Sequence, residues 1–295
     1  MPSLVHPGVP NNFVGYDSDP EKAKIWVFGV PFDSTTSYRS GARRGPRAIR
    51  EASQQTEVFD ILTKSDISMD PGFFDLGDMD VARGDSAKTV KMVVDEIKNI
   101  LDSNKTPLML GGEHTLTAGG VQGVKEFFNK PFKVIYFDAH GDLRDVYEHD
   151  KYNHACTARR VVEEVGKENL LEIGIREISE EEFQLFGDRM IFRHECRNDH
   201  KSTIEKIKKF VAGSDIYISL DIDVMDVGVV PGTGTPQADG LLYNEILDYF
   251  IALKSCKKIL AMDLMELAPL RESHVSEVSA TKLLFQACAQ LKEKF

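Results

Sequence analysis

The sequence predicts an α/β fold, a three-layer αβα sandwich built on a mostly parallel sheet of about eight strands. Short apolar segments alternate with longer amphipathic segments along almost the whole chain, and this alternation is typical of a parallel sheet with helices on both faces. Several apolar segments, such as residues 134–137, contain no polar residue, as expected of strands buried on both faces. Polar residues gather where these segments end.

The N-terminal half opens with residues 1–23, which are polar and rich enough in proline to predict a surface arm. Residues 25–31, IWVFGVP, form the first apolar run and the first expected strand. Pro46 then falls where the first turn of a helix tolerates proline. The other elements expected in this half are strands at 73–78, 107–111 and 132–138, a helix over 86–101 and a helix that begins near His114.

The C-terminal half continues the alternation without a linker or a low-complexity run. A Lys-rich helix is expected at 201–211, and a helix with a continuous apolar face at 241–253. The other expected elements are helices at 155–165 and 275–293 and strands at 170–176, 189–193, 216–222 and 258–265. Since no boundary interrupts the series, we expect residues 1–295 to form a single domain.

The composition bounds the partners and the cellular setting. The 42% hydrophobic and 28% charged residues are ordinary for a soluble globular protein, and no apolar run approaches the roughly 20 residues of a membrane span. The N-terminus lacks a secretion signal, so we expect a cytoplasmic protein. The formal charge of −11 disfavours nucleic acid and anionic membranes and suits a cationic substrate. The four cysteines are scattered, and we expect free buried thiols: Cys156, Cys196, Cys256 and Cys288.

Candidate metal ligands follow three of the expected strands. The sequences are GGEHT at 111–115, FDAHGD at 137–142 and LDID at 220–223. Alternate side chains at a strand end point the same way, and in open α/β sheets ligands bind at the C-terminal ends of the strands. The two glycines of GGEHT allow close backbone approach at a crowded centre. The candidate ligands are His114, Asp138, His140, Asp142, Asp221 and Asp223.

Four carboxylates in one crevice predict bound cations. Their mutual repulsion and desolvation would be costly unless cations neutralise them, and two divalent ions balance the formal charge. Oxygen and imidazole ligands without cysteine favour Mn²⁺ over a thiolate zinc site. A water that bridges two such ions, roughly 3.5 to 4 Å apart, becomes a hydroxide near neutral pH. The sequence therefore predicts metal-assisted hydrolysis.

The motifs also resemble those of a known family. GVPFDSTTSYRSGARRGPRAIRE, GGEHT, YFDAHGD, SLDIDVMD, PGTGTP and MDLMELAP stand in the order seen in the ureohydrolases, the arginase and agmatinase superfamily. The resemblance covers the chain from about residue 25 to its end. It implies an arginase-like fold, two Mn²⁺ per subunit and a homotrimer or homohexamer.

The resemblance also implies residue roles. The more deeply set ion would be held by His114, Asp138, Asp142 and Asp221. The second ion would be held by His140 and Asp223, with Asp138 and Asp221 bridging the two ions. Asp142 would also accept a hydrogen bond from the bridging hydroxide. Glu266 of MDLMELAP would pair with the substrate guanidinium. His154, a loop imidazole expected to titrate near neutrality, would contact the substrate and shuttle a proton to the leaving amine.

Departures from the arginase pattern bear on the substrate. Arg144 stands where arginases carry an asparagine, and Ser179 of GIREIS stands where they carry an acid, so both argue against arginine. HGDLRD and KYNHACTARR are closer to agmatinases of archaeal type, which make putrescine, a polyamine precursor, and urea from agmatine. Asp145, with Glu148 and Asp150, would suit the agmatine ammonium. Arg144 would instead suit a carboxylated guanidine such as guanidinobutyrate or guanidinopropionate, and N1-aminopropylagmatine fits the acidic loop equally well.

Ordinary structural roles and different reaction classes also fit parts of this pattern. A histidine that opens a helix is more often a polar terminal residue than a catalyst, which applies to His154, and acids at strand ends such as Glu266 are common. Binuclear metallophosphoesterases also use D-x-H, but they usually add a GNH block that this sequence lacks. Metal-dependent deacetylases bind one metal with fewer acids. Urea, phosphate and acetate release distinguish these classes.

Overall fold

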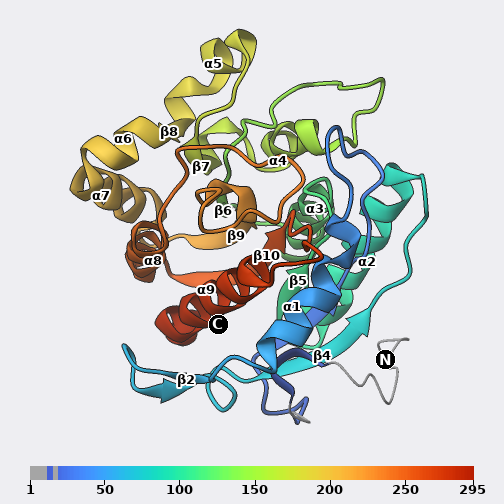
Figure 1. Cartoon of the computed structure of the whole chain (residues 1–295), viewed down its shortest axis with the longest axis vertical. Helices are drawn as coiled ribbons and strands as arrows, with labels where there is room; N and C mark the ends of the chain where they lie inside the picture. Colours follow the sequence, from blue (N-terminus) through green and yellow to red (C-terminus); the bar gives the residue numbers. More distant parts are fainter. Residues whose placement is uncertain (1–11, 16–18) are drawn as a thin grey trace.

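A parallel sheet forms the centre of the protein, in a computed structural model that describes residues 12–15 and 19–295. Within these residues the sheet has eight strands in the order β4-β1-β5-β10-β9-β6-β7-β8, and the pairings between neighbours are parallel (Figure 1). The strands are β1 (Ile25–Gly29), β4 (Phe73–Asp78), β5 (Thr106–Leu110), β6 (Lys133–Phe137), β7 (Leu170–Ile175), β8 (Met190–Phe192), β9 (Asp215–Asp221) and β10 (Lys258–Met265). The predicted α/β class and parallel sheet are confirmed.

Helices cover both faces of the sheet and make a three-layer structure. On one face α2 packs on α3 and α3 on α4, and on the other α1 and α8 pack on α9 and α7 on α8 (Figure 1). The helices are α1 (Gly45–Ser53), α2 (Ser86–Asp102), α3 (Leu116–Phe128), α4 (Thr157–Val165), α5 (Glu180–Phe186), α6 (Arg193–Asn198), α7 (His200–Val211), α8 (Tyr243–Ala252) and α9 (Val275–Leu291). Among the described residues, no helix is both long and apolar enough to cross a bilayer.

The strands bury side chains on both faces of the sheet. In β6, Ile135 and Phe137 belong to one apolar cluster, whereas Val134 and Tyr136 belong to the other. Successive side chains of a strand point to opposite faces, so an unbroken apolar strand supplies both clusters. This is the arrangement that the apolar run 134–137 predicts.

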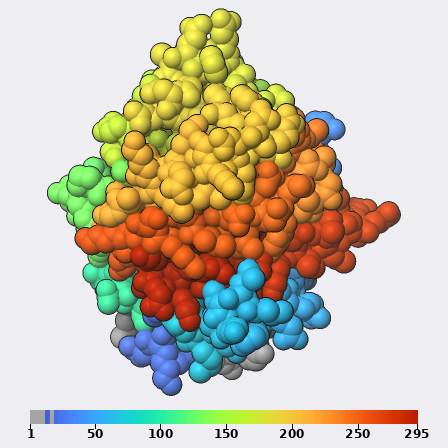
Figure 2. Space-filling view, turned by 90° about the vertical axis from the view of Figure 1, so that its left-hand side faces the viewer, coloured from blue at the N-terminus to red at the C-terminus, as the bar shows by residue number. Residues whose placement is uncertain are grey.

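Some elements lie outside the predicted series. A short antiparallel hairpin, β2 (Phe59–Asp60) and β3 (Ser65–Asp66), lies on the surface beside α9 (Figure 2). Two helices, α5 and α6, were also not expected. Ser179 and Glu182 form a capping box that starts α5, and the Glu195 carboxylate accepts the Phe192 backbone N–H at the start of α6. The Glu195 cap starts a helix at Arg193, so the strand predicted at 189–193 ends at Phe192.

The predicted surface arm is wrong at Phe13 and Val14, which are buried, whereas Asp19, Glu21 and Lys22 are exposed as predicted. Residues 1–11 and 16–18 lie outside the described residues, but Phe13 is 2% exposed and belongs to the core. Its ring packs edge-to-face on Phe73 and Phe285, with centroids 5.1 and 5.5 Å away. One aromatic residue in a polar stretch has no periodicity, so the sequence pattern could not place it.

A buried ion pair ties α1 to the edge strand β4. Arg50 is 3% exposed and donates two hydrogen bonds to the Asp75 carboxylate, at 2.7 and 2.9 Å, and one to Asp78. Burial disfavours the charge of Arg50, but its hydrogen bonds to Asp75 hold its pKa above the usual value. The Asp75 carboxylate also accepts the Phe13 backbone N–H at 2.6 Å. The pair therefore anchors three segments.

Replacing Arg50 with leucine is expected to lower the free energy of unfolding by about 3–5 kcal/mol, because it leaves the buried Asp75 carboxylate without its cation. Urea denaturation measures this change. The matched control is Arg47→Leu one turn earlier in α1, where the guanidinium is exposed and pairs with the exposed Glu51. The control is expected to change stability little, and an equally small effect of Arg50→Leu would contradict the anchoring role.

Candidate active site

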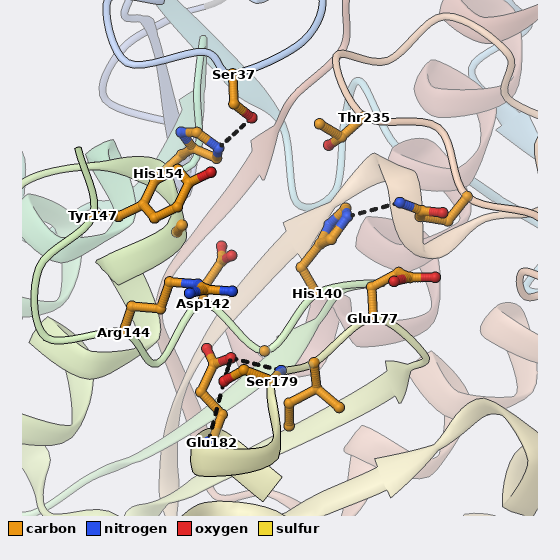
Figure 3. Close-up of a pocket in the computed structure, with 14 residues that line it drawn as sticks. Ser37, His140, Asp142, Arg144, Tyr147, His154, Glu177, Ser179, Glu182 and Thr235 are labelled. Atoms are coloured by element: carbon orange, nitrogen blue, oxygen red, sulfur yellow. Dashed lines mark hydrogen bonds between the residues drawn. The ribbon is translucent and has the colours of Figure 1, made fainter.

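The predicted ligand motifs meet at the C-terminal ends of neighbouring central strands. The strands β5, β10, β9 and β6 are adjacent in the sheet, and GGEHT, FDAHGD and LDID follow β5, β6 and β9. A cavity of about 280 Å³ opens at this edge, and His140, Asp142, Arg144 and His154 are among the side chains that line it (Figure 3). Segments that lie more than a hundred residues apart in the chain therefore share one site.

Close backbone packing supports this site, as the two glycines of GGEHT predict. A Cβ atom at Gly111 would collide with the Met265 side chain, and one at Gly112 would collide with the Phe32 carbonyl. Only glycine allows the loop that carries His114 to lie against these neighbours.

The first group of candidate ligands surrounds the buried His114 side chain. Its Nδ1 atom lies 3.0 Å from both Asp138 Oδ2 and Asp221 Oδ2, and 3.5 Å from Asp142 Oδ2. The second group surrounds His140, whose Nδ1 atom lies 3.1 Å from Asp223 Oδ2 and 3.5 Å from Asp138 Oδ1. Asp138 presents one oxygen to each group.

This arrangement fits two divalent cations. Ligand atoms about 2.1 Å from an ion in octahedral geometry lie about 3 Å from one another, which is close to the separations found here. The ligand atoms form two sets of three, and within each set the atoms lie no more than 4.8 Å apart. One set comes from His114, Asp138 and Asp221, and the other from Asp138, His140 and Asp223. The donors are carboxylate oxygens and imidazole nitrogens, which suits Mn²⁺. The structure brings Asp221 to the first group, and its predicted bridging role remains a prediction.

A buried hydrogen-bond chain orients His114 for metal binding. Ser219 donates its hydroxyl hydrogen to Asp263 Oδ1 at 2.8 Å, so its oxygen accepts the Nε2–H of His114 at 2.9 Å. Nδ1 is then the nitrogen with a free lone pair, and it faces the carboxylates. Asp263 also accepts hydrogen bonds from Thr117 and Tyr217. The motifs did not predict this support, although Asp263 is the one acid inside the apolar strand β10.

Burial and charge crowding shape the pKa values of the site. Burial, together with repulsion from neighbouring carboxylates, holds the pKa values of Asp142 and Asp221 well above their ordinary range. Burial lowers the pKa of His114, but hydrogen bonds to Asp138 and Asp221 outweigh it and raise the pKa well above its usual value. Protons and cations therefore compete for the same buried ligands.

Glu266 lies beside the first ligand group, at the end of β10. Its carboxylate accepts the His114 backbone N–H at 2.7 Å, and it is 5% exposed. Its backbone φ of 63° is in the left-handed region that non-glycine residues rarely adopt, as is the φ of 47° at Asp142. Burial is the largest cause that raises the pKa of Glu266, to about 8, and repulsion from the nearby Glu113 carboxylate adds to it. Glu266 is not among the described residues that line the cavity, so its contact with a guanidinium remains a prediction.

His154 faces the cavity, as predicted, at the start of the 3₁₀ turn before α4 (Figure 3). Its Nδ1 atom lies 3.1 Å from Thr35 Oγ1 and its Nε2 atom 3.4 Å from Ser37 Oγ. Burial is the largest cause that lowers the pKa of His154, to about 4. The expectation of titration near neutrality is therefore wrong for this environment, which favours the neutral imidazole.

The acidic loop does not face the cavity as predicted. Arg144 lines the cavity, with its guanidinium 5.2 Å from the Tyr147 ring centroid. The Asp145 carboxylate instead pairs with Arg160 at 2.7 Å, and hydrogen bonding to Arg160 lowers its pKa. Asp145, Glu148 and Asp150 are not among the described lining residues, so the structure gives no support to the predicted substrate contact of Asp145.

Two other acids line the cavity and were missed, Glu177 and Glu182 (Figure 3). Glu182 is occupied because it accepts hydrogen bonds from Leu143 N–H and from Ser179. Glu177 is exposed beside His140, and its carboxylate has no ion pair among the described residues. The sequence did carry a signal for Glu177. In the GIREIS motif, Glu177 stands at the first acid of the arginase pattern G-x-R-D-x-D.

Comparison with known proteins supports the geometry. Residues 23–289 match the arginase family. The N(1)-aminopropylagmatine ureohydrolase of Thermococcus kodakarensis is 38% identical over 270 residues, which is 90% of each chain, and the agmatinase of Bacillus cereus is 32% identical over 268 residues, also 90% of each chain. The crystal structure of the agmatine ureohydrolase of Thermoplasma volcanium is 33% identical, superposes with a TM-score of 0.83, and covers 93% of this chain and 91% of that one.

Proposed function

Because this chain belongs to the arginase family, we propose that it is a binuclear manganese ureohydrolase that cleaves agmatine to putrescine and urea. The observation that carries the proposal is the convergence of two imidazoles and four carboxylates into two ligand groups that share Asp138. Relatives named agmatinase and N(1)-aminopropylagmatine ureohydrolase support a cationic guanidine as the substrate. The trimer or hexamer, the single domain and the cytoplasmic location remain predictions.

Two divalent ions, when bound by these ligands, supply a hydroxide near neutral pH and a Lewis acid. The chain's own residues do the rest. Glu266 holds the guanidinium, because a buried carboxylate next to the ligands can pair with a cation and orient its carbon. His154 exchanges a proton with the leaving amine from the wall of the cavity. Arg144 and Glu177 face the part of the substrate that lies outside the guanidinium.

N1-aminopropylagmatine is the second candidate substrate, and Glu177 favours it. A longer polyamine carries further ammonium groups beyond the agmatine chain. The Glu177 carboxylate lines the cavity and has no ion pair within the described part of the chain, so it can pair with one of them. The same residue offers nothing to a carboxylated guanidine. Arg144 offers the opposite charge, but its guanidinium lies near the Tyr147 ring.

The test of the proposal is urea release by Mn²⁺-loaded protein from agmatine, N1-aminopropylagmatine, guanidinobutyrate and arginine at equal concentrations. Agmatine is expected to give the highest kcat/KM. Preference for guanidinobutyrate would make Arg144 the specificity residue and contradict the choice of a cationic substrate. If the protein releases phosphate from phosphate esters or acetate from acetylated amines, and no urea from any guanidine, it is not a ureohydrolase.

Replacing Glu177 with glutamine is expected to lower kcat/KM for N1-aminopropylagmatine by roughly 3- to 5-fold, the range of one partly exposed ion pair, and to change agmatine turnover less. Glu181→Gln is the matched control, since Glu181 is exposed and does not line this cavity. Equal losses for both substrates, or none, would contradict a contact between Glu177 and the distal ammonium.

A further inference from the structure

A buried hydrogen-bond relay connects His154 to Glu113, a residue to which neither the sequence motifs nor the proposed mechanism give a role. Glu113, from the GGEHT loop after β5, is fully buried. Its Oε2 accepts the Thr35 backbone N–H at 2.7 Å, and its Oε1 lies 3.0 Å from Thr35 Oγ1. The same Thr35 Oγ1 lies 3.0 Å from the His154 backbone N and 3.1 Å from His154 Nδ1.

The hydrogen count at Thr35 Oγ1 leaves one solution when Glu113 is a carboxylate, the form in which both of its oxygens accept from Thr35. Burial raises the pKa of Glu113 to about 7, so the count applies above that pH. A hydroxyl has one hydrogen to donate and two lone pairs to accept with. The carboxylate can only accept, so the hydroxyl hydrogen goes to Glu113 Oε1. The His154 backbone N–H takes one lone pair. The other lone pair then faces Nδ1 and requires a hydrogen on that nitrogen.

We propose that Glu113 acts through Thr35 as a positioning residue, which fixes His154 as the Nδ1–H tautomer and leaves the lone pair of Nε2 free to exchange protons. The nitrogen that carries a proton in a neutral histidine is set by the hydrogen bond that the other nitrogen makes. His154 donates two hydrogen bonds to this one hydroxyl oxygen, from its backbone N–H and from its ring, and together they fix the direction of the ring. Glu113 touches neither the cavity nor a reacting atom among the contacts of the described residues.

In this tautomer the free nitrogen, Nε2, lies at the cavity. Nε2 lies 3.4 Å from the hydroxyl of Ser37, and both residues line the cavity (Figure 3). With Nδ1 occupied by Thr35, every proton that His154 takes up or releases passes through Nε2, on the substrate side. The catalytic consequence rests on the proposed function, whereas the tautomer itself does not.

Nitrogen NMR of protein with ¹⁵N-labelled histidine, recorded at a pH above the raised pKa of Glu113, tests the tautomer. The protein is loaded with Zn²⁺, a diamagnetic ion that preserves the signals, and His154 is assigned from the spectrum of His154→Gln. The expected result is a hydrogen on Nδ1 in the wild type, which Thr35→Ser retains and Thr35→Val loses. A hydrogen on Nε2 in the wild type, or an Nδ1–H that persists in Thr35→Val, would overturn the proposal.

Kinetics of the Mn²⁺-loaded protein test the consequence. Loss of the relay in Thr35→Val or Glu113→Gln is expected to lower kcat by about 10- to 100-fold, as for other partners that orient a functional histidine, with KM changed less than about 2-fold. Thr35→Ser is expected to restore kcat. Thr56→Val is the matched control, because among the described residues that hydroxyl donates to the Ala52 carbonyl of α1 and not to the relay. A wild type with Nδ1–H that releases no urea would overturn the proposed function and leave the relay intact.

Discussion

Replacing Asp138 with asparagine is expected to lower kcat roughly 10³-fold or more and to reduce the number of Mn²⁺ ions that the chain retains. Asp138 presents an oxygen to each ligand group, one 3.0 Å from His114 Nδ1 and the other 3.5 Å from His140 Nδ1. An amide offers one neutral oxygen, so both groups lose charge. The loss is large because bound ions can lower the pKa of water by about nine units, and each unit corresponds to about 1.4 kcal/mol.

Metal content by mass spectrometry and urea release from agmatine measure the two effects on the same sample. Asp145→Asn is the matched control because Asp145 is an exposed acid of the following loop, and its pairing with Arg160 directs it away from the cavity. The control is expected to keep both ions and its kcat, which also tests the predicted substrate contact of Asp145. Full metal content and activity in Asp138→Asn would show that the shared ligand is misassigned.

Replacing Glu266 with glutamine is expected to lower kcat/KM for agmatine by roughly 30- to 5,000-fold, while two ions stay bound. Removing one partner of a buried charge pair costs about 2–5 kcal/mol, which corresponds to that range. The glutamine carbonyl can still accept the His114 backbone N–H that Glu266 now accepts, so the first ligand group keeps its support. Steady-state kinetics and metal content separate substrate binding from metal loss.

Glu163→Gln is the control for Glu266→Gln, because Glu163 is an exposed acid on α4 that pairs with Arg159 and Arg160. It is expected to leave kcat/KM unchanged. If Glu266→Gln loses less than about 5-fold, or loses activity only together with its metal, the guanidinium is held elsewhere. Glu113 would then be the next acid to examine, since it raises the pKa of Glu266 and is equally buried.

The sequence predicted the ligand centre because strand ends are predictable. Apolar runs locate β5, β6 and β9, and a ligand at a strand end must point to the common edge of a parallel sheet. The order of the strands was not predictable in the same way. The last strand, β10, pairs between β5 and β9, and this pairing joins residues more than 150 positions apart. It is this pairing that brings Glu266 beside His114.

Loop side chains explain most of what the sequence could not provide. In the 141–153 loop, Asp142, Glu148 and His149 have positive φ, so the alternation that orients strand side chains fails there. Asp145 consequently meets Arg160 rather than the cavity. Thr35 follows β1 and Glu113 follows β5, and their side chains meet in the folded protein. Nothing in the sequence around either residue indicates this contact. The burial of Phe13 likewise depends on partners 60 and more residues away.

Urea formation from agmatine as a function of bound Mn²⁺ tests the central claim most directly. Protein freed of metal by a chelator is titrated with Mn²⁺, and bound ions and urea are measured at each step. The account predicts no urea from metal-free protein and a rate that reaches its plateau at two ions per chain. Urea formation that persists in metal-free protein, or a plateau at one ion, would contradict a binuclear metal-dependent reaction.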